Sequence, residues 1–389
     1  MILPGATLGV LGGGQLGRMF AVQARTMGYR VVVLDPDPTS PAAAVADEHL
    51  CAAYDDRDAL ALLGTRCDAV TTEFENVPAA TLRALEQYCV VRPPVGAVTI
   101  AQDRISEKTF LRTHGVPVAP WAPVRDFRDL EDATAATGVP AILKTSRLGY
   151  DGKGQAVIDS RDAASRAFAA FGGVECVLER RLALECELSV VLARGVDGAL
   201  ASFPPAENVH RDGILFTSSV PAMVAAELAE GAVTIACRVA HALEYVGVLA
   251  VELFVADGGV LYVNEIAPRP HNSGHYTLDA CVADQFEQQV RTLCGLPLGA
   301  PTLLSPVVLI NLLGDVWSGG PPRWEKALEV PGVKLHLYGK AEPRPERKMG
   351  HLNCLAPSVA EAYRLATGAL AALRRSTTDV YPIPEVPLP

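Results

Sequence analysis

The sequence has neither paired cysteines nor a long apolar run. Its nine cysteines stand apart from one another, and no two follow the C-x-x-C spacing of structural zinc sites. Reduced thiols that pack as small core side chains are therefore expected. No apolar run approaches the roughly 20 residues that cross a bilayer, and the N-terminus lacks a basic segment followed by an apolar one. We expect a soluble, cytoplasmic protein.

Positive charge is also scarce. The chain carries 34 lysines and arginines against 44 aspartates and glutamates, a formal net charge of −10. This balance disfavours nucleic acid and anionic membranes as partners, although a local basic cluster can still bind a small anion. With 389 residues, 49% of them hydrophobic, the chain is long and apolar enough for two or three domains with sizeable cores.

The first hundred residues alternate between short apolar runs and helical segments. Strands are expected at 8–11, 31–34 and 68–74, and helices at 15–27 and 77–88. Because parallel strands need crossover helices, this alternation predicts a parallel sheet with helices on both faces.

A glycine-rich turn joins the first strand to the first helix. Its sequence, Gly12-Gly13-Gly14-Gln15-Leu16-Gly17, matches the G-x-G-x-x-G fingerprint of dinucleotide-binding domains, and Asp35 ends the next strand. The match alone discriminates poorly, because the same geometry places any phosphate at a helix N-terminus. An NAD(P)-dependent oxidoreductase stays open as an alternative.

The rest of the chain divides into further parts. A helix at 98–114 leads into a small lid that ends near residue 180, and a strand-rich section follows. A C-terminal section holds strands at 307–310 and 333–338 and a helix at 358–374. We predict a fold that mixes α/β and α+β organisation in four parts, at 1–100, 101–180, 181–305 and 306–389.

The most informative motif is Gly149-Tyr150-Asp151-Gly152-Lys153-Gly154-Gln155. It lies between the apolar runs 141–143 and 156–158, which predicts a strand, a glycine-rich loop and a strand. Three glycines let backbone N–H groups approach an anion, and Lys144 and Lys153 add positive charge. The loop suits a flap over a nucleotide polyphosphate. It lacks the G-x-x-x-x-G-K-[ST] spacing of a Walker A loop.

Two glutamates interrupt neighbouring apolar runs. Glu252 lies within 249–254 and Glu265 within 261–266, and Asp257-Gly258-Gly259 between them is a hairpin turn signal. The two carboxylates can therefore project together, where they repel unless a cation lies between them. Mg²⁺ is the expected cation, with Mn²⁺ as an alternative, because it takes carboxylate and phosphate oxygens. Two solvent-facing glutamates on an edge strand are the other interpretation.

Polar residues cluster in two later segments. Residues 267–276 follow the second of these runs and contain Arg269, His271 and His275, a density typical of a binding loop. A single histidine would favour a structural role, whereas two with an arginine favour a site. The basic residues between 340 and 351 predict an anion site or a solvated turn.

Taken together, these motifs and their order resemble the N5-carboxyaminoimidazole ribonucleotide synthetases of the ATP-grasp superfamily. The most discriminating are Phe74-Glu75-Asn76, His271-Asn272-Ser273-Gly274-His275 and Arg347-Lys348-Met349-Gly350-His351. The resemblance runs through nearly the whole chain. It implies a Rossmann-like N-terminal domain, an ATP-grasp fold with a small lid, and a C-terminal β-rich domain.

The resemblance also implies ligands for individual residues. Glu252 and Glu265 would hold the metal. The ribonucleotide would lie against residues of four segments: Gln15, Leu16, Glu73, Asn76, Ser273, Gly274, Lys340 and Arg347. ATP would contact the flap residues 149–155 and residues before and after it: Arg104, Lys144, Glu179, Leu182, Glu187, His210 and Asn264.

The reaction implied by the resemblance is the ATP- and bicarbonate-dependent carboxylation of 5-aminoimidazole ribonucleotide. ATP would phosphorylate bicarbonate, and carboxyphosphate, or CO₂ released from it, would be captured by the exocyclic amine. Arg269 would hold bicarbonate, and His271 or His275 would move the amine proton. Asn272 and Lys348 complete the expected catalytic set. The partners would be these small molecules and a second copy of the chain in a homodimer.

Three other functional classes account for part of these motifs. A formate-dependent glycinamide ribonucleotide transformylase would share the flap and the glutamate pair, but the H-N-S-G-H and R-K-M-G-H runs argue against it. An oxidoreductase leaves the flap and the glutamates unexplained. A nucleotide-binding regulator without activity is the non-catalytic alternative.

Overall fold

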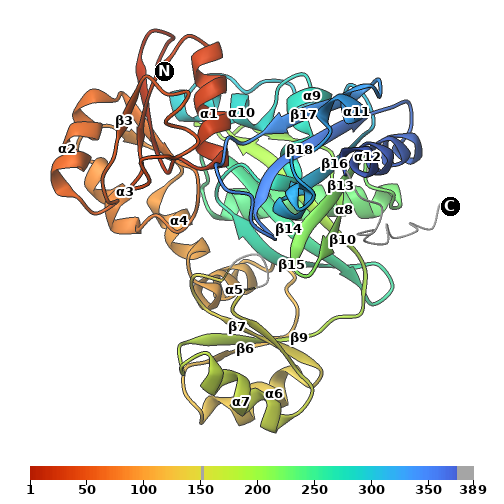
Figure 1. The fold of residues 1–389 in the computed structure, drawn as a ribbon. Helices are drawn as coiled ribbons and strands as arrows, with labels where there is room; N and C mark the ends of the chain where they lie inside the picture. The colour runs from red at the N-terminus through yellow and green to blue at the C-terminus, as the bar shows by residue number, and fades with distance from the viewer. Residues whose placement is uncertain (150–152, 375–389) are drawn as a thin grey trace.

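Three sheets divide the protein into an N-terminal unit, a small lid and a large body (Figure 1). The computed structural model describes residues 1–149 and 153–374. Tyr150, Asp151 and Gly152 of the predicted flap lie outside this part of the chain. None of the helices in these two ranges is long and apolar enough to cross a membrane.

The N-terminal unit is a parallel sheet in the order β3-β2-β1-β4-β5. Its strands are β1 (Thr7–Leu11), β2 (Arg30–Leu34), β3 (Glu48–Leu50), β4 (Ala69–Thr72) and β5 (Val90–Val91). Its helices are α1 (Gln15–Thr26), α2 (Arg57–Arg66), α3 (Ala79–Leu85) and α4 (Val95–Ala101). The predicted parallel sheet is thus confirmed. α3 begins later than expected because Pro78 is its extended N-cap residue.

The single helix expected at 98–114 is wrong, because two helices occupy this segment. Asp103 interrupts it with an extended backbone and N-caps α5 (Arg104–Thr113), since its side chain accepts a hydrogen bond of 2.9 Å from Ser106 N–H. The break lets α5 leave the N-terminal unit in a new direction and run beside the lid (Figure 1).

The lid is a four-stranded antiparallel sheet in the order β6-β9-β7-β8, with two helices packed on one face (Figure 1). Its elements are β6 (Trp121–Val124), α6 (Asp129–Thr137), β7 (Ala141–Thr145), β8 (Gln155–Ile158), α7 (Arg161–Ala170) and β9 (Cys176–Arg180). Leu143, Leu178 and Phe168 are buried between the sheet and the helices. β7 pairs with β8, so the predicted strand, glycine-rich loop and strand form a hairpin.

The large body is built on a nine-stranded sheet in the order β15-β14-β10-β12-β13-β16-β18-β17, with β11 paired to β10. The strands are β10 (Leu184–Arg194), β11 (Leu200–Ser202), β12 (Ala206–Arg211), β13 (Ile214–Val220), β14 (Gly247–Ala256), β15 (Val260–Ala267), β16 (Val307–Leu313), β17 (Val333–Leu337) and β18 (Lys348–Leu355). The last three come from the predicted C-terminal section, which therefore extends this sheet.

Helices cover the sheet and attach the N-terminal unit to it. They are α8 (Ala226–Ala242), α9 (Thr277–Ala280), α10 (Gln285–Cys294), α11 (Trp324–Leu328) and α12 (Val359–Leu373), with 3₁₀ turns η1 (Asn272–Gly274) and η2 (Gly314–Trp317). Phe286 and Val290 of α10 share one buried core with Phe20 and Ala21 of α1. This apolar contact fixes the N-terminal unit beside the sheet, because separating them would expose both faces to water.

Candidate functional site

A cavity of about 1030 Å³ opens where the N-terminal unit, α5, the lid and the large sheet meet. This volume suits substrates of nucleotide size. Most residues predicted for the site line it: Gln15, Leu16, Glu73, Asn76, Arg104, Lys144, Gly149, Lys153, Gln155, Glu187, His210, Glu252, Asn264, Glu265, Arg269, His271, Asn272, Lys340, Arg347 and Lys348. Segments distant in sequence thus share one space.

Six other predicted residues within the described ranges do not line this cavity: Gly154, Glu179, Leu182, Ser273, Gly274 and His275. The ring of His275 is fully buried, and burial lowers its pKa well below the ordinary range. The structure therefore places His275 in the support of the loop, at a distance from the cavity surface. Glu179 and Ser273 are also buried and act through neighbours described below.

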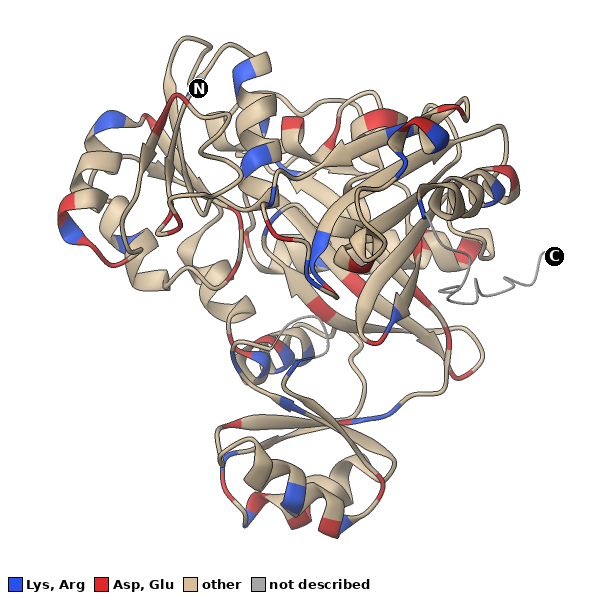
Figure 2. Ribbon diagram, in the orientation of Figure 1, with Lys and Arg blue, Asp and Glu red and all other residues tan. Residues whose placement is uncertain are grey.

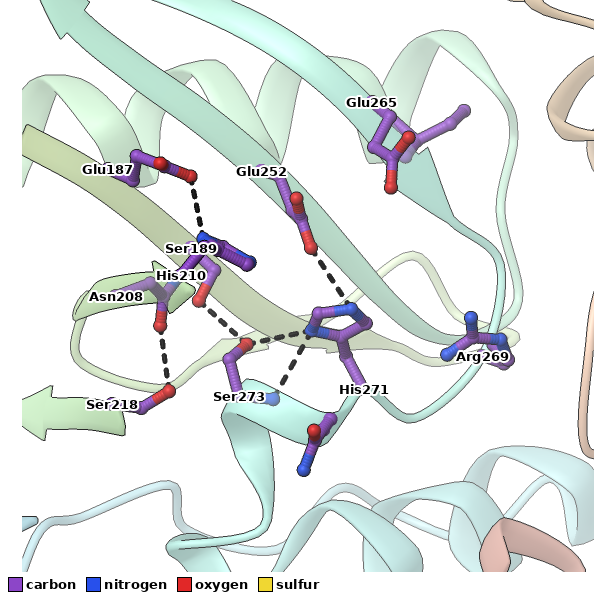
Figure 3. Close-up of polar contacts among 12 residues, drawn as sticks. Glu187, Ser189, Asn208, His210, Ser218, Glu252, Glu265, Arg269, His271 and Ser273 are labelled. Atoms are coloured by element: carbon purple, nitrogen blue, oxygen red, sulfur yellow. Dashed lines mark hydrogen bonds and ion pairs between the residues drawn. The ribbon is translucent and has the colours of Figure 1, made fainter. Parts of the chain in front are cut away.

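Glu252 and Glu265 are direct cross-strand partners on β14 and β15 and project from one face of the sheet (Figure 3). Oε1 of Glu252 lies 3.0 Å from Nε2 of His271, and Oε2 of Glu265 lies 2.8 Å from an Arg104 guanidinium nitrogen. Burial opposes ionisation of Glu252, but its hydrogen bond with His271 outweighs burial and lowers the pKa of this carboxyl. The predicted hairpin and pairing are present.

A β-bulge aims the next side chain. The register slips by one residue after the glutamate pair, so Asn264 is the extra residue on β15. Its Oδ1 lies 3.3 Å from Nζ of Lys144, and its carbonyl accepts a hydrogen bond of 2.7 Å from Lys108. Bulges next to active sites commonly redirect a side chain in this way.

The donor set around the pair fits Mg²⁺. Two carboxylates and an amide supply oxygen ligands, which this hard cation prefers. Among the described residues, no group of three or more His, Cys, Asp or Glu side chains could hold a metal. Mg²⁺ commonly takes one or two protein carboxylates and completes its coordination with substrate phosphates.

Three buried ionic groups connect α5 to the lid. Glu179 lies 3.2 Å from Lys108 and 3.3 Å from Lys144, and all three are almost inaccessible to water. Although burial opposes its ionisation, the two lysines lower the pKa of Glu179 to about 2. Lys108 and cavity-lining Glu107 were not predicted. Glu107 and Lys108 lie three and four positions after Arg104 on α5. This spacing places them near Arg104 on the helix and could have indicated that they belong to the site.

Arg269 is paired with a residue to which the sequence assigned no role. Its Nε forms a short ion pair with Glu75, the acid of the Phe74-Glu75-Asn76 motif. Burial raises the pKa of Glu75, but Arg269 outweighs it and the net shift is downward. The pair joins the N-terminal unit to the loop that follows β15 and holds the guanidinium at the cavity.

Acidic side chains occupy the glycine-rich turn of the N-terminal unit. The N–H groups of Gly14 and Gly17 donate to Glu73 at 2.6 and 2.7 Å, and that of Gly13 donates to Asp35 at 2.7 Å. Carboxylates therefore stand where a dinucleotide would place its pyrophosphate. This finding removes the physical basis for the NAD(P) alternative.

Basic residues line the end of the cavity that lies at this N-terminal turn. Lys340 donates to Oε1 of Gln15 at 2.7 Å and to the carbonyl of Lys348 at 2.7 Å, which links the C-terminal section to the N-terminal turn. Arg347 lines the same end. Basic and acidic segments otherwise alternate over the molecule and lie side by side along α5 (Figure 2). The cavity thus presents cations to anionic ligands within an acidic protein.

Known families match the chain in three successive parts. They are the ribonucleotide synthetase preATP-grasp domain at residues 5–102, the ATP-grasp domain at 109–286 and the phosphoribosylaminoimidazole carboxylase C-terminal domain at 307–364. The N5-carboxyaminoimidazole ribonucleotide synthase of Brucella melitensis is 48% identical over 356 residues, which are 91% of this chain and 97% of the relative.

Two crystal structures of relatives share the fold. The ADP complex of the Staphylococcus aureus synthetase has 38% identity and a TM-score of 0.89, and the match covers 95% of this chain and 98% of that one. The Aspergillus clavatus synthase with ADP and 5-aminoimidazole ribonucleotide has 30% identity and a TM-score of 0.86, with the same coverage. The predicted fold class is confirmed, and the chain belongs to the N5-carboxyaminoimidazole ribonucleotide synthases, a family of ATP-grasp ligases.

Proposed function

We propose that this enzyme carboxylates the exocyclic amine of 5-aminoimidazole ribonucleotide, using ATP and bicarbonate and releasing ADP and phosphate. The observation that carries the proposal is the single cavity with cations at both ends and a carboxylate pair between them. The Aspergillus relative binds ADP together with 5-aminoimidazole ribonucleotide. A cavity of about 1030 Å³ has room for both.

We assign the two ends of the cavity to the two nucleotides. ATP lies between the lid and the sheet, where Arg104, Lys144 and Lys153 face its phosphates. The ribonucleotide lies against the N-terminal turn, where Lys340 and Arg347 face its phosphate. Arginine and lysine suit these roles because they donate charge-assisted hydrogen bonds to phosphate oxygens.

Glu252, Glu265 and Asn264 are the residues that would hold Mg²⁺ beside the ATP phosphates. When bound, this ion neutralises phosphate charge and orients the phosphoryl group. Arg104 then has a second task, since its contact with Glu265 at 2.8 Å orients that carboxylate. The buried pair of Lys108 and Glu179 holds Lys144 at the cavity wall.

The chemistry takes two steps. An oxygen of bicarbonate attacks the γ-phosphorus of ATP, the bond to the β-phosphate oxygen breaks, and ADP leaves with the electron pair. The ribonucleotide amine then attacks the carboxyl carbon of carboxyphosphate, or of CO₂ formed from it, and phosphate is released. Arg269, fixed by Glu75, holds the anionic oxygens of bicarbonate. Closure of the lid excludes water that would hydrolyse the intermediate.

The test is ADP release from Mg-ATP and bicarbonate, with and without 5-aminoimidazole ribonucleotide. We expect strong stimulation by the ribonucleotide and formation of one carboxylated product per ADP. Activity instead with glycinamide ribonucleotide and formate would contradict the substrate and retain the ligase class. The cytoplasmic location and the homodimer expected from the sequence stay predictions, which fractionation and sedimentation can address.

A further inference from the structure

A chain of hydrogen bonds runs from His271 into the interior, away from the cavity. Nδ1 of His271 lies 2.8 Å from Oγ of Ser273, which lies 2.7 Å from Oγ of Ser189 (Figure 3). Both serines are almost fully buried, with exposed fractions of 0% and 1%. They cannot reach a substrate, so any effect they have on the reaction passes through His271.

The backbone identifies which nitrogen of His271 carries the proton. The N–H of Ser273 points at Nδ1 from 3.3 Å, and His271 caps η1 through this contact. An amide N–H can only donate, so Nδ1 must present a lone pair. At the other side of the ring Nε2 lies 3.0 Å from the carboxylate of Glu252, which can only accept. Both contacts require the proton on Nε2.

Gln285 fixes the position of the same residue through its backbone. Its Oε1 accepts from His271 N–H at 2.9 Å, and its Nε2 donates to the His271 carbonyl at 2.9 Å. Gln285 is fully buried at the start of α10. A Cβ at Gly274 would come within 2.6 Å of its Oε1, so glycine at this position makes room for the contact.

The sheet aligns Ser189 with this arrangement. Ser189 on β10 is the direct cross-strand partner of Glu252 on β14, as Glu252 is of Glu265 on β15. Facing residues of paired strands project from the same face of the sheet. The serine therefore supports Ser273 from the same row that carries the two glutamates.

We propose that Ser273, supported by Ser189 and Gln285, is a positioning residue that holds His271 in the tautomer with its proton on Nε2. In this tautomer His271 donates its Nε2–H to the carboxylate of Glu252, and Nε2 has no lone pair with which to accept the amine proton. To accept a proton at Nε2, the ring would have to move its own proton to Nδ1, where two donors already point.

The proton balance follows from the proposed function, on which this part rests. As the amine nitrogen bonds to the carboxyl carbon of carboxyphosphate, the carbon–oxygen bond to phosphate breaks and phosphate leaves with the electron pair. The released phosphate is a strong base and takes the amine proton. The Nε2–H of His271 meanwhile stays with Glu252 and orients that carboxylate towards the cavity.

The tautomer can be tested on the ligand-free enzyme by ¹⁵N NMR with labelled histidine. The His271 signals are assigned by their loss in H271Q. We expect a protonated Nε2 and an unprotonated Nδ1 in the wild type, and a displaced Nδ1 signal in S273A, which loses the hydroxyl contact but keeps the backbone N–H. A wild-type enzyme with the proton on Nδ1, or an S273A spectrum identical to that of the wild type, would overturn the proposal.

Kinetics give a second readout. S273A should lower kcat about tenfold, a typical effect of removing a residue that orients a functional histidine, while KM for Mg-ATP stays unchanged. Ser189 is one hydrogen bond further from His271, so S189A should lower kcat by a smaller factor than S273A. S218A is the matched control, since Ser218 is equally buried but donates to Asn208 at 2.8 Å. Equal losses of kcat in S273A and S218A would refute a positioning role.

The two proposals fail separately. If the wild type shows no ADP release stimulated by 5-aminoimidazole ribonucleotide, the proposed function is wrong, yet the ligand-free spectrum still decides the tautomer. If ADP release is stimulated and the tautomer is the opposite one, only the role of His271 is wrong.

Discussion

Two groups of acids and cations lie within the same site and differ in how they meet water. At the root of the lid, Glu179 is enclosed by Lys108 and Lys144, and none of the three side chains is more than 6% exposed. At the cavity, the side chain of Glu265 is paired with Arg104 but remains 36% exposed. Both are glutamates in ion pairs, so residue type does not distinguish them.

The two acids differ in whether they can exchange one cationic partner for another. Removing a partner from the enclosed group would leave a charge buried without compensation, which is strongly unfavourable. The exposed oxygen of Glu265 can accept a new cation without any such loss. We infer that the enclosed group is part of the framework and that the open pair carries the chemistry, and this division makes the two groups separable by mutation.

The largest effect is expected from E265Q. The amide keeps the shape of the side chain but removes the negative charge that a divalent cation needs. ATP turnover should fall on the order of 10³-fold, the range seen when charge stabilisation at the transferring phosphoryl group is lost. The measurement is ADP release at saturating Mg-ATP, with the thermal midpoint as a control for folding. An unchanged rate would show that Glu265 does not hold the metal.

E179Q should mainly lower the stability of the protein, whereas E265Q should mainly lower its activity. The E179Q change leaves two buried lysines without their counter-charge, so the free energy of unfolding should fall by about 3–5 kcal/mol. E175Q is the matched control, because Glu175 is 55% exposed in its pair with Arg125 and should cost less than about 1 kcal/mol. Urea unfolding at pH 7 measures both. Equal costs would mean that the enclosed group contributes nothing to stability.

Glu179 should also make the free energy of unfolding depend on pH in acid. Its folded pKa of about 2 lies below the ordinary 4.5, so its contribution is present above about pH 4.5 and is lost as the pH falls towards 2. The E179Q variant lacks this loss, and its difference from the wild type should therefore shrink over that window.

The sequence was sufficient for the fold class, and most of the residues that it suggested for a site line one cavity. Alternating apolar runs predicted the parallel sheet, and the Asp257-Gly258-Gly259 turn predicted the hairpin that pairs the two glutamates. Such features depend on local patterns, which is why they can be recognised without coordinates.

Features that depend on tertiary packing were not predictable. His271 and His275 lie in one loop four residues apart, yet only the first reaches the cavity, because η1 turns the second into the core. The bulge at Asn264 and the carboxylates that fill the glycine-rich turn are likewise set by contacts between distant segments. A pattern of residue types cannot state which side chain faces inward.

Glu107 provides the smallest and most discriminating test of the comparison. It is as buried as Glu179, but its carboxylate accepts a hydrogen bond of 2.6 Å from the backbone N–H of Ile266. Burial therefore prevails over the nearby Lys108 and Arg104 and raises its pKa to about 7, whereas the pKa of Glu179 falls. Equal burial thus produces opposite shifts, depending on how closely cations approach the carboxylate.

The sign of the stability change follows from proton binding. Between pH 4.5 and 7 the folded state holds a proton on Glu107 that the unfolded state has released, so stability falls as the pH rises through this window. Relative to the wild type, E107Q should therefore gain stability from pH 5 to pH 8, by roughly 1–3 kcal/mol. Urea unfolding at both pH values, with E175Q to correct for loss of one charge, gives this difference. Parallel pH dependence of wild type and E107Q would mean that Glu107 is ionised throughout, and that burial alone does not separate the framework acids from one another.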